Sequence, residues 1–367
     1  MLRIKLLLSA IGMLFTTMAF AQFHTLNIPH ASNAVTETQR LGVTDITVTY
    51  HSPSANGRDV WNDTHVIPQN GNPIPWRAGA NMNTTIKFST DVSIEGHELK
   101  AGVYGFHVIP KGEAYTLLFA HNHEQWGSYY LNIEADVTLS VDVSAQSASF
   151  SEKLDYEFLN WKENSVVIGL EWADKRLPFS VSVDLNKTVT DSFRSELRGI
   201  NTYHWQAWND AASWCLNHNT NLEEALLWAE RSINGGFNGF AANKNFTNVS
   251  TKLQLLKKLK KEDEFKSTLN DIESIQYSTG EAYQFSRMLI GFGDYSEALE
   301  FTLKANIKYP DTWFLIVNEG ISMYFLNQPE DAIKAIERAL ELAPQSYHER
   351  FQQVANDMKS GIYKLPS

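Results

Sequence analysis

The chain has 367 residues, of which 43% are apolar and 20% charged, so it is long enough for two or three domains and does not belong to the disordered class. Its single cysteine, Cys215, excludes an intrachain disulfide and a zinc site built on several cysteines. The formal net charge is −11, from 31 Lys and Arg against 42 Asp and Glu. This acidity argues against nucleic acid or an anionic membrane surface as the partner.

The first 21 residues have the pattern of a signal peptide. Two basic residues, Arg3 and Lys5, precede an apolar run over Leu6–Phe20, and Ala19 and Ala21 supply the small residues that signal peptidase requires. The alternative is an uncleaved anchor, but the run is shorter than the roughly 20 residues that span a bilayer. We therefore expect cleavage after residue 21, a periplasmic or secreted mature protein, and no membrane-spanning segment within it.

Residues 44–190 predict a β domain, preceded by an N-terminal extension over residues 22–43. The segment Val137–Ser144 alternates apolar and polar side chains strictly, which is typical of a strand with one buried face. Similar short segments separated by turn residues predict the other strands: Asp45–Tyr50, Thr85–Ser89, Val103–Ile109, Tyr115–Ala120, Leu154–Leu159, Val166–Trp172 and Leu177–Val183. Eight or nine strands with no helical period between them favour an all-β antiparallel sandwich or jelly roll.

Beyond Phe193 the apolar period becomes helical, and residues 200–363 predict an all-α repeat array. Three residues recur at an offset of 34, where Ala298, Ala305 and Pro310 are followed by Ala332, Ala339 and Pro344. This spacing resembles the tetratricopeptide repeat (TPR), which implies pairs of antiparallel helices that meet at small residues. Gly320 and Ser286 occupy the small position of the first helix in that family. We expect three or four helix pairs and a capping helix over Ser346–Lys359.

The loops of the β domain hold the densest group of polar and aromatic residues. Two elements stand out, Trp76-Arg77-Ala78-Gly79-Ala80-Asn81 and Gln125-Trp126-Gly127. Together with the later Glu171-Trp172 pair, they resemble a bacterial family known only as domain of unknown function 2911, over about Asp45–Asp184. The resemblance implies no activity, substrate or cofactor.

These loops suggest a ligand site. The candidate ligand-binding residues are Arg58, Trp76, Arg77, Asn81, Gln125 and Trp126. Arginine can clamp a carboxylate or phosphate, tryptophan can stack on a sugar or aromatic face, and the amides can supply directional hydrogen bonds. The alternative, which we favour, is that Arg77 ties loop carbonyls together and the two tryptophans plug the end of the sandwich.

Support for catalysis is sparse. His121 and His123 alternate at the end of a predicted strand, where two imidazoles can share a metal ion, but no third ligand of known position accompanies them. His107 and His97 could complete such a site, but the sequence does not give their distance from the pair. A solvated turn is the favoured interpretation, so we expect no metal, no cofactor and no catalytic residue. The sequence has no Gly-x-Ser-x-Gly elbow, phosphate-binding loop or His-Glu-x-x-His motif. The alternative function is a hydrolase or carbohydrate-active enzyme with its site on the Arg58, Arg77 and Trp126 face.

The helical array offers a different kind of site. In TPR arrays the first helices line a concave groove, and that resemblance places five residues on it: Tyr283, Arg287, Val317, Ile321 and Tyr324. The alternative is that these residues pack against neighbouring helices or the β domain. A groove of this kind suits an extended peptide or a partner helix. We therefore predict an exported, non-catalytic binding or scaffold protein with a protein or peptide partner, and leave its oligomeric state open.

Overall fold

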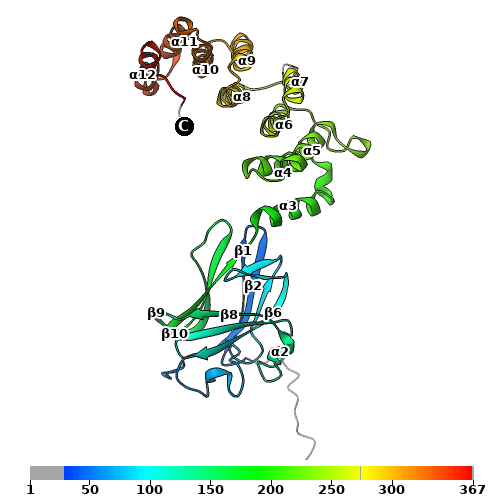
Figure 1. Ribbon diagram of the computed structural model, residues 1–367, viewed down its shortest axis with the longest axis vertical. Coiled ribbons are helices and arrows are strands. Elements are labelled where there is room, and N and C mark those ends of the chain that lie inside the picture. The colour runs from blue at the N-terminus through cyan, green and yellow to red at the C-terminus, as the bar shows by residue number, and fades with distance from the viewer. Residues whose placement is uncertain (1–28, 273, 366–367) are drawn as a thin grey trace, which may run out of the picture. The chain divides into compact units, whose positions relative to one another are not determined.

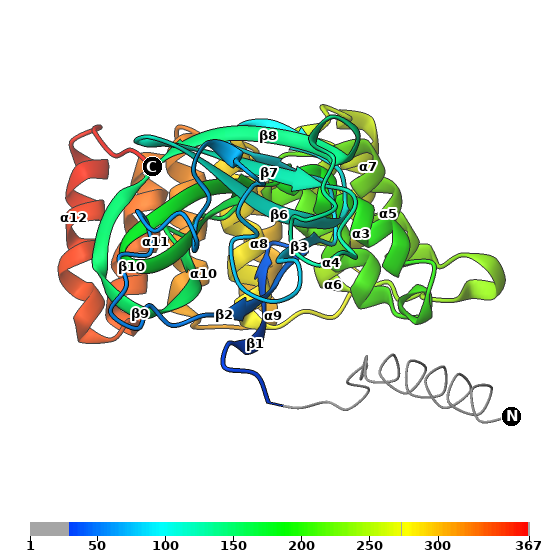
Figure 2. The same cartoon turned by 90° about the horizontal axis from the view of Figure 1, so that it is seen from below.

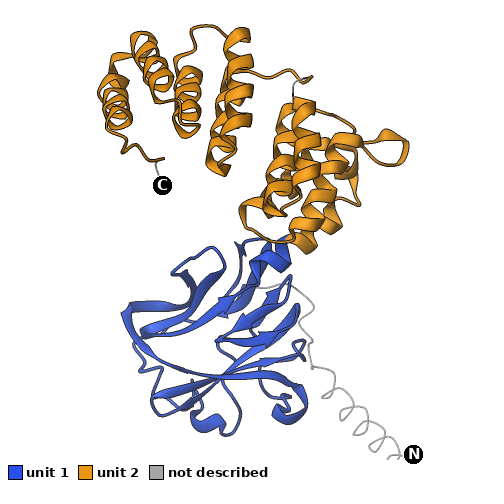
Figure 3. Ribbon diagram, turned by 45° about the horizontal axis from the view of Figure 1, so that its top comes forward, with its two compact units in different colours: residues 1–189 blue, residues 190–367 orange. Residues whose placement is uncertain are grey.

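The computed structural model describes residues 29–272 and 274–365 (Figure 1). The chain divides into two compact units, of which the first ends at Val189 and the second begins at Thr190 (Figure 3). The predicted signal peptide lies outside the described residues. Among the helices of the described chain, none combines the length and the apolar character that crossing a bilayer requires.

The first unit consists of two antiparallel sheets. Their strands are β1 (Asn33–Leu41), β2 (Thr44–Ser52), β3 (Thr85–Phe88), β4 (Val92–Ile94), β5 (His97–Leu99), β6 (Gly102–Lys111), β7 (Ala114–Ala120), β8 (Val137–Ser144), β9 (Gln146–Leu159) and β10 (Ser165–Ser182). The larger sheet has the order β1-β2-β3-β6-β7-β8, and the smaller has the order β5-β4-β10-β9. The prediction of an antiparallel β domain is confirmed.

Large side chains from both sheets fill the space between them. The Phe106 ring of β6 lies 5.5 Å from that of Phe179 on β10 and 6.2 Å from that of Tyr156 on β9, measured between centroids. Phe119 of β7 also contacts Phe179, at 5.9 Å. All four side chains are buried, and burial of one such side chain contributes about 1.5–3 kcal/mol. The two sheets therefore form a sandwich around a shared aromatic core.

The predicted extension over residues 22–43 is partly wrong, because residues 33–41 form β1 at the edge of the larger sheet. β1 pairs with β2 along its whole length. Its side chains are mainly polar, and the hydroxyls of Thr38 and Thr47 are hydrogen bonded across the pair at 2.8 Å. An edge strand with so few apolar residues shows little alternation, which concealed it in the sequence.

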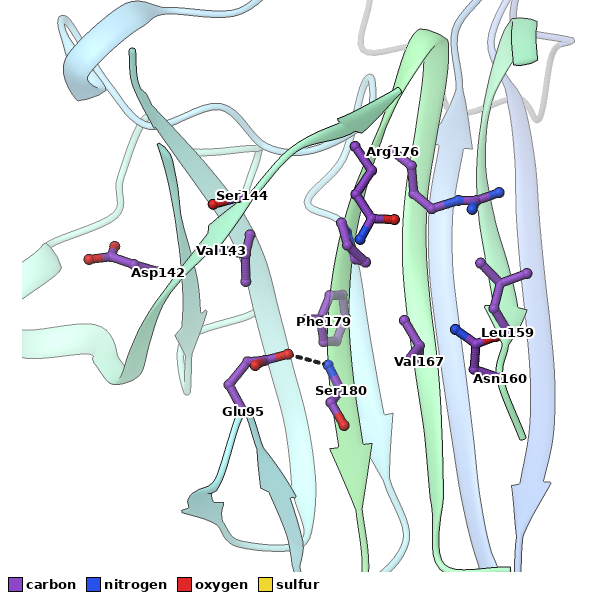
Figure 4. A pocket seen from close by; sticks show the side chains of 12 residues that line it. Glu95, Asp142, Val143, Ser144, Leu159, Asn160, Val167, Arg176, Phe179 and Ser180 are labelled. Carbon is purple, nitrogen blue, oxygen red and sulfur yellow. Dashed lines mark hydrogen bonds between the residues drawn. The ribbon is translucent and has the colours of Figure 1, made fainter. Parts of the chain in front are cut away.

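Strand β10 bends back on itself near Ala173, whose φ is 51°. The amide of Val183 donates to the carbonyl of Asn164 at 3.0 Å, so the two ends of the strand lie together. Figure 4 shows the β10 ribbon turning back at its upper end. The predicted strands Val166–Trp172 and Leu177–Val183 correspond to the two halves of this bent strand.

The second unit is an array of antiparallel helix pairs. Its helices, with α3 crossing from the first unit, are α3 (Leu185–Glu196), α4 (Trp205–Asn217), α5 (Leu222–Asn234), α6 (Phe246–Lys258), α7 (Glu262–Ile272), α8 (Thr279–Phe292), α9 (Tyr295–Lys308), α10 (Trp313–Phe325), α11 (Pro329–Leu342) and α12 (His348–Lys359). Consecutive helices pack in the pairs α4–α5, α6–α7, α8–α9 and α10–α11 (Figure 1), and α12 packs on α11. Figure 2 shows α12 at one end of the array. The predicted repeat architecture and its capping helix are confirmed.

Small residues at the repeat positions let paired helices approach closely. Ala298 and Ala305 of α9, and Ala332 and Ala339 of α11, are all fully buried. A Cβ atom added at Gly320 of α10 would lie 3.0 Å from the Ala332 carbonyl oxygen of α11. The 34-residue recurrence thus marks the contacts between helices. Cys215 lies in the same continuous core, fully buried on α4.

Replacing Gly320 by valine should lower the free energy of unfolding by about 1–3 kcal/mol, because the added side chain must push α10 away from α11. Gly291→Val is the matched control, since Gly291 is an exposed helical glycine of α8 with no atom within 4 Å of an added Cβ. Urea denaturation followed by circular dichroism at helical wavelengths measures both. Equal stability of the two variants would contradict the close packing.

Candidate functional site

Trp76, a predicted ligand residue, belongs to the core of the sandwich. Only 4% of its surface is exposed. Its backbone exchanges two 2.8 Å hydrogen bonds with Val108 of β6, and its indole stacks on that of Trp172 with centroids 6.0 Å apart. Trp61 packs edge-on against it at 5.8 Å. The side chain is thus not available for stacking on a ligand. Of the two tryptophans expected to plug the end of the sandwich, Trp76 is buried, whereas Trp126 is 53% exposed, so that expectation is wrong for Trp126.

The two predicted arginine clamps bind the chain's own carbonyl groups. Arg58 donates to the carbonyl oxygens of Ala55 and Ser54, at 2.9 and 2.7 Å. Arg77 donates from Nη1 to the carbonyl oxygen of Asn81. These contacts support the interpretation that the arginines hold the loops in shape. They do not favour the anion clamp of the alternative enzyme.

The Arg77 guanidinium is also enclosed by the second loop. It lies over the ring of Tyr129, 5.1 Å from the centroid. A Cβ atom at Gly127 would stand 2.3 Å from its central carbon, so a larger residue there would displace the guanidinium. The Trp-Arg-x-Gly-Ala-Asn and Gln-Trp-Gly elements therefore meet in space, with Arg77 between them.

Beneath these loops the structure gathers buried polar side chains that have unpaired atoms. Asn81 Nδ2, Asn83 Oδ1, His107 Nε2 and both side-chain atoms of Gln125 are buried and have no hydrogen-bond partner among the described residues. We call Asn81, Asn83, His107 and Gln125 the amide cluster. Asn83 was not predicted, and His107 was considered only as a metal ligand beside His121 and His123. The available signal for His107 was its place within an apolar strand segment.

His107 is neutral at physiological pH. It is fully buried on β6, and its Nδ1 is hydrogen bonded to Ser128 Oγ at 2.7 Å. Burial lowers the pKa of His107 to about 4, and the positive charge of Arg77 acts in the same direction. The imidazole therefore contributes a polar group without a charge to the amide cluster.

Of the predicted histidine pair, only the His123 backbone contacts this cluster. His121 is exposed, and His123 is half-buried with its carbonyl accepting from Asn83 Nδ2 at 3.2 Å. Across residues 29–272 and 274–365, no three His, Cys, Asp or Glu side chains gather closely enough to hold a metal ion.

A concavity of the β domain, with a volume of about 410 Å³, opens beside β10 (Figure 4). Its charged groups already have protein partners. Glu95 accepts from the Ser180 amide at 2.5 Å, and Arg176 is paired with Glu171 at 2.5 Å. Asp142 accepts from Thr116 at 2.6 Å. The charged side chains that line this concavity thus have partners within the chain.

The helical array holds a pocket of about 130 Å³ that brings together four of the five predicted groove residues. Its lining comes from α8, α10, the 3-10 helix η4 (Gln345–Tyr347), α12 and the segment after α12. It consists of Tyr283, Arg287, Trp313, Phe314, Val317, Asn318, Ile321, Tyr347, Arg350, Phe351, Val354 and Tyr363. Tyr324 does not line it, because its ring packs against that of Tyr363 at 5.6 Å. We refer to this surface as the array pocket.

The array pocket is apolar with two positive charges. Arg287 and Arg350 supply them, and its lining contains no Asp or Glu. Neither guanidinium forms an ion pair within the described residues, whereas Arg194 and Arg338 of the same array do. Burial raises the pKa of Tyr363, and the two nearby guanidiniums oppose that rise.

Asn318 was not among the predicted groove residues, and it holds two of the pocket helices together. Its Nδ2 donates to Ser286 Oγ at 2.7 Å and to the Tyr283 carbonyl at 3.3 Å. Asn318 is on α10, and both partners are on α8. The TPR spacing placed Ser286 at a small-residue position. It did not predict the hydrogen bond that Ser286 accepts from Asn318, which depends on side-chain geometry.

Comparison with known proteins agrees with this division of the chain. A family model described as "Protein of unknown function (DUF2911)" matches residues 32–181. No curated protein matches the chain.

Solved structures similar to this chain include "MamA 41-end from Desulfovibrio magneticus RS-1". It is 15% identical, over 43% of this chain and 92% of that one, with a TM-score of 0.30. "Crystal structure of YrrB: a TPR protein with an unusual peptide-binding site" is 16% identical, over 46% of this chain and 99% of that one, with a TM-score of 0.26. The β domain thus matches the DUF2911 family model, and it is followed along the chain by the helix pairs of the array.

Proposed function

We propose that the protein is a non-catalytic binding protein whose array pocket holds an extended segment of a protein partner. The observation that carries the proposal is the make-up of this pocket: a ring of aromatic side chains beside Arg287 and Arg350, with no acidic residue in its lining. In a chain with a net charge of −11, a pocket lined by two arginines and no carboxylate is a local excess of positive charge.

The aromatic side chains form the apolar part of the pocket. Trp313 contacts Tyr347 and Phe351, with centroids 4.8 and 5.6 Å apart, and Phe314 contacts Tyr283 at 5.5 Å. Trp313 and Phe314 are half-buried, and Tyr283 and Tyr347 are exposed. A partner side chain that enters the pocket removes these faces from water, which is the main source of affinity in such grooves.

The chain itself shows what kind of group fits there. Residues 362–365, which follow α12 and form neither helix nor strand, place Tyr363 in the pocket with 9% of its surface exposed. Its ring lies 6.0 Å from that of Phe325 and packs edge-on against Tyr324. An irregular segment that presents an aromatic side chain is thus already accommodated on this surface.

The two guanidiniums define the charge of the partner. Arg287 is half-buried and Arg350 is exposed, and both lie beside the aromatic rings. A partner segment can therefore pair a carboxylate with a guanidinium while an adjacent apolar side chain packs on the rings. Each charge-assisted hydrogen bond contributes about 1.5–3 kcal/mol. The partner segment we propose therefore carries Asp or Glu adjacent to an aromatic or aliphatic residue.

Selection of random displayed peptides on the purified protein tests the proposal. The enriched peptides should combine an acidic with an apolar residue, and the double variant Arg287→Gln, Arg350→Gln should bind them about 10- to 100-fold more weakly. The control is Arg338→Gln on α11, which removes one guanidinium that is paired with Asp311 on an exposed surface. It should leave the affinity for the peptides unchanged.

The outcomes separate the parts of the proposal. Enrichment of neutral or basic peptides that the double variant binds equally well would refute the acidic partner and leave an apolar groove. Failure to enrich any peptide over a variant whose pocket is filled by Val317→Trp would refute peptide binding at the array pocket.

We also propose that the protein acts in the periplasm or outside the cell. The basic, apolar and small-residue pattern over residues 1–21 supports export. The single, fully buried cysteine is compatible with an oxidising compartment, since it offers no exposed thiol.

A further inference from the structure

The amide cluster of the β domain contains polar groups that folding alone does not explain. Gln125 is 7% exposed, and neither Nε2 nor Oε1 of its side chain has a partner in the described chain. Asn83 is 7% exposed with an unpaired oxygen, and His107 is fully buried with Nε2 unpaired. Buried polar atoms are nearly always hydrogen bonded, so several unpaired atoms in one place indicate a missing partner.

The cluster is held together by contacts between two loops and β6. The backbone amide of Asn83 donates to the backbone carbonyl oxygen of Gln125 at 3.3 Å. A Cβ atom at Gly105 would stand 2.5 Å from Asn83 Nδ2 and 3.2 Å from His107 Nε2, which places both groups around that glycine. The first loop is anchored from the smaller sheet, because Tyr156 donates to the Ala78 carbonyl at 2.9 Å. These contacts hold Asn83 and the backbone of Gln125 together beside His107.

Exposed apolar side chains lie next to the cluster in the same loops. Trp126 is 53% exposed, beside Gln125 in the chain, and Tyr129 and Tyr130 are 62% and 76% exposed. Met82, between Asn81 and Asn83, is also exposed. With Ile133, these residues are five of the seven exposed large apolar side chains of the β domain, the other two being Phe150 and Trp161. Apolar side chains beside fixed polar groups are the usual composition of a ligand site.

The chemistry of these groups selects the ligand. The amide nitrogens of Asn81 and Gln125 donate, and the oxygens of Asn83 and Gln125 accept. The neutral imidazole adds no charge, the cluster has no carboxylate, and Arg77 already donates to the Asn81 carbonyl. A hydroxyl group both donates and accepts, and the C–H face of a pyranose ring stacks on aromatic side chains such as Trp126.

We infer that this face of the β domain is a saccharide-binding site, in which Trp126 and the neighbouring tyrosines stack on sugar rings and the amide cluster hydrogen bonds to their hydroxyls. In the described conformation the unpaired atoms are covered. Binding therefore requires the Trp126–Tyr130 segment, which lies outside the strands, to move and admit a hydroxyl to Gln125.

The test begins with an array of immobilised glycans and continues in solution with chitotetraose and cellotetraose. We expect at least one saccharide to bind and to change the tryptophan fluorescence as Trp126 is covered. Retention of no glycan by the folded protein would overturn the inference.

Two variants then locate the site. Trp126→Ala should weaken binding of the retained saccharide about tenfold or more without unfolding the exposed loop, while Trp161→Ala, the control at another exposed tryptophan, should not. Gln125→Met should abolish binding while the melting temperature stays the same or rises, because the amide has no protein partner to lose. A fall in melting temperature with unchanged binding would show that Gln125 serves only the fold.

Discussion

Replacing Trp76 by alanine is expected to lower the free energy of unfolding of the β domain by about 3–5 kcal/mol, the range for removing a large aromatic side chain from a core. Trp76 lies between the indoles of Trp61 and Trp172, and all three are buried. The neighbours are held by another contact, since Trp61 Nε1 donates to the Trp172 carbonyl at 2.8 Å. The surrounding chain therefore cannot collapse easily into the space left by the substitution.

Urea denaturation followed by the near-ultraviolet circular dichroism of the tryptophans measures this loss. The matched control is Trp126→Ala, in which an exposed indole is removed and the stability should change by no more than about 0.5 kcal/mol. If Trp76→Ala changed the free energy of unfolding only slightly but abolished ligand binding, Trp76 would be a ligand-binding residue. This comparison thus separates the two roles that the sequence left open for tryptophan in these loops.

Phe285→Ala should destabilise the helical array by a similar amount, about 3–5 kcal/mol. Phe285 of α8 is 2% exposed and contacts Phe246 of α6 and Phe301 of α9, with centroids 5.4 and 4.8 Å away. Tyr277 completes this aromatic group, which joins the helix pair α6–α7 to the pair α8–α9. In a repeat array each pair depends on its neighbours, so the substitution weakens the junction as well as the pair.

Helical circular dichroism during urea denaturation gives the stability, and limited proteolysis shows where the array opens. We expect new cleavage between α7 and α8 in the Phe285 variant. Phe237→Ala is the control, because that side chain is 80% exposed in the connection between α5 and α6 and its removal should have no measurable effect. Identical cleavage patterns for the two variants would contradict the joining role of the aromatic group.

The sequence predicted those parts of the fold in which one period is sustained. The 34-residue recurrence identified the contacts of α9 and α11, where alanines are fully buried. β1 was missed because its alternation is carried by threonines and charged residues, and β4 and β5 because three residues are too short to show a period. The two strands predicted at the bend near Ala173 were located correctly because turn residues interrupt their apolar run.

Prediction of the sites depended on whether a side chain's partner is nearby in sequence. The helical register placed Tyr283, Arg287, Val317 and Ile321 on one surface, and these residues line the array pocket. Arg350 and Tyr363 lie beyond the two repeats that the 34-residue offset relates, so the helical register did not place them on this surface. His107 could not be placed in the amide cluster, because its neighbours there come from loops about 20 residues away on either side.

The position of Cys215 has a practical consequence for measuring the array. This only thiol of the chain is fully buried on α4, and burial raises its pKa to about 11, so it is protonated and shielded in the folded protein. A thiol reagent can modify it only after the helices around it separate. The rate of labelling under native conditions therefore reports how often this end of the array opens, without any introduced probe.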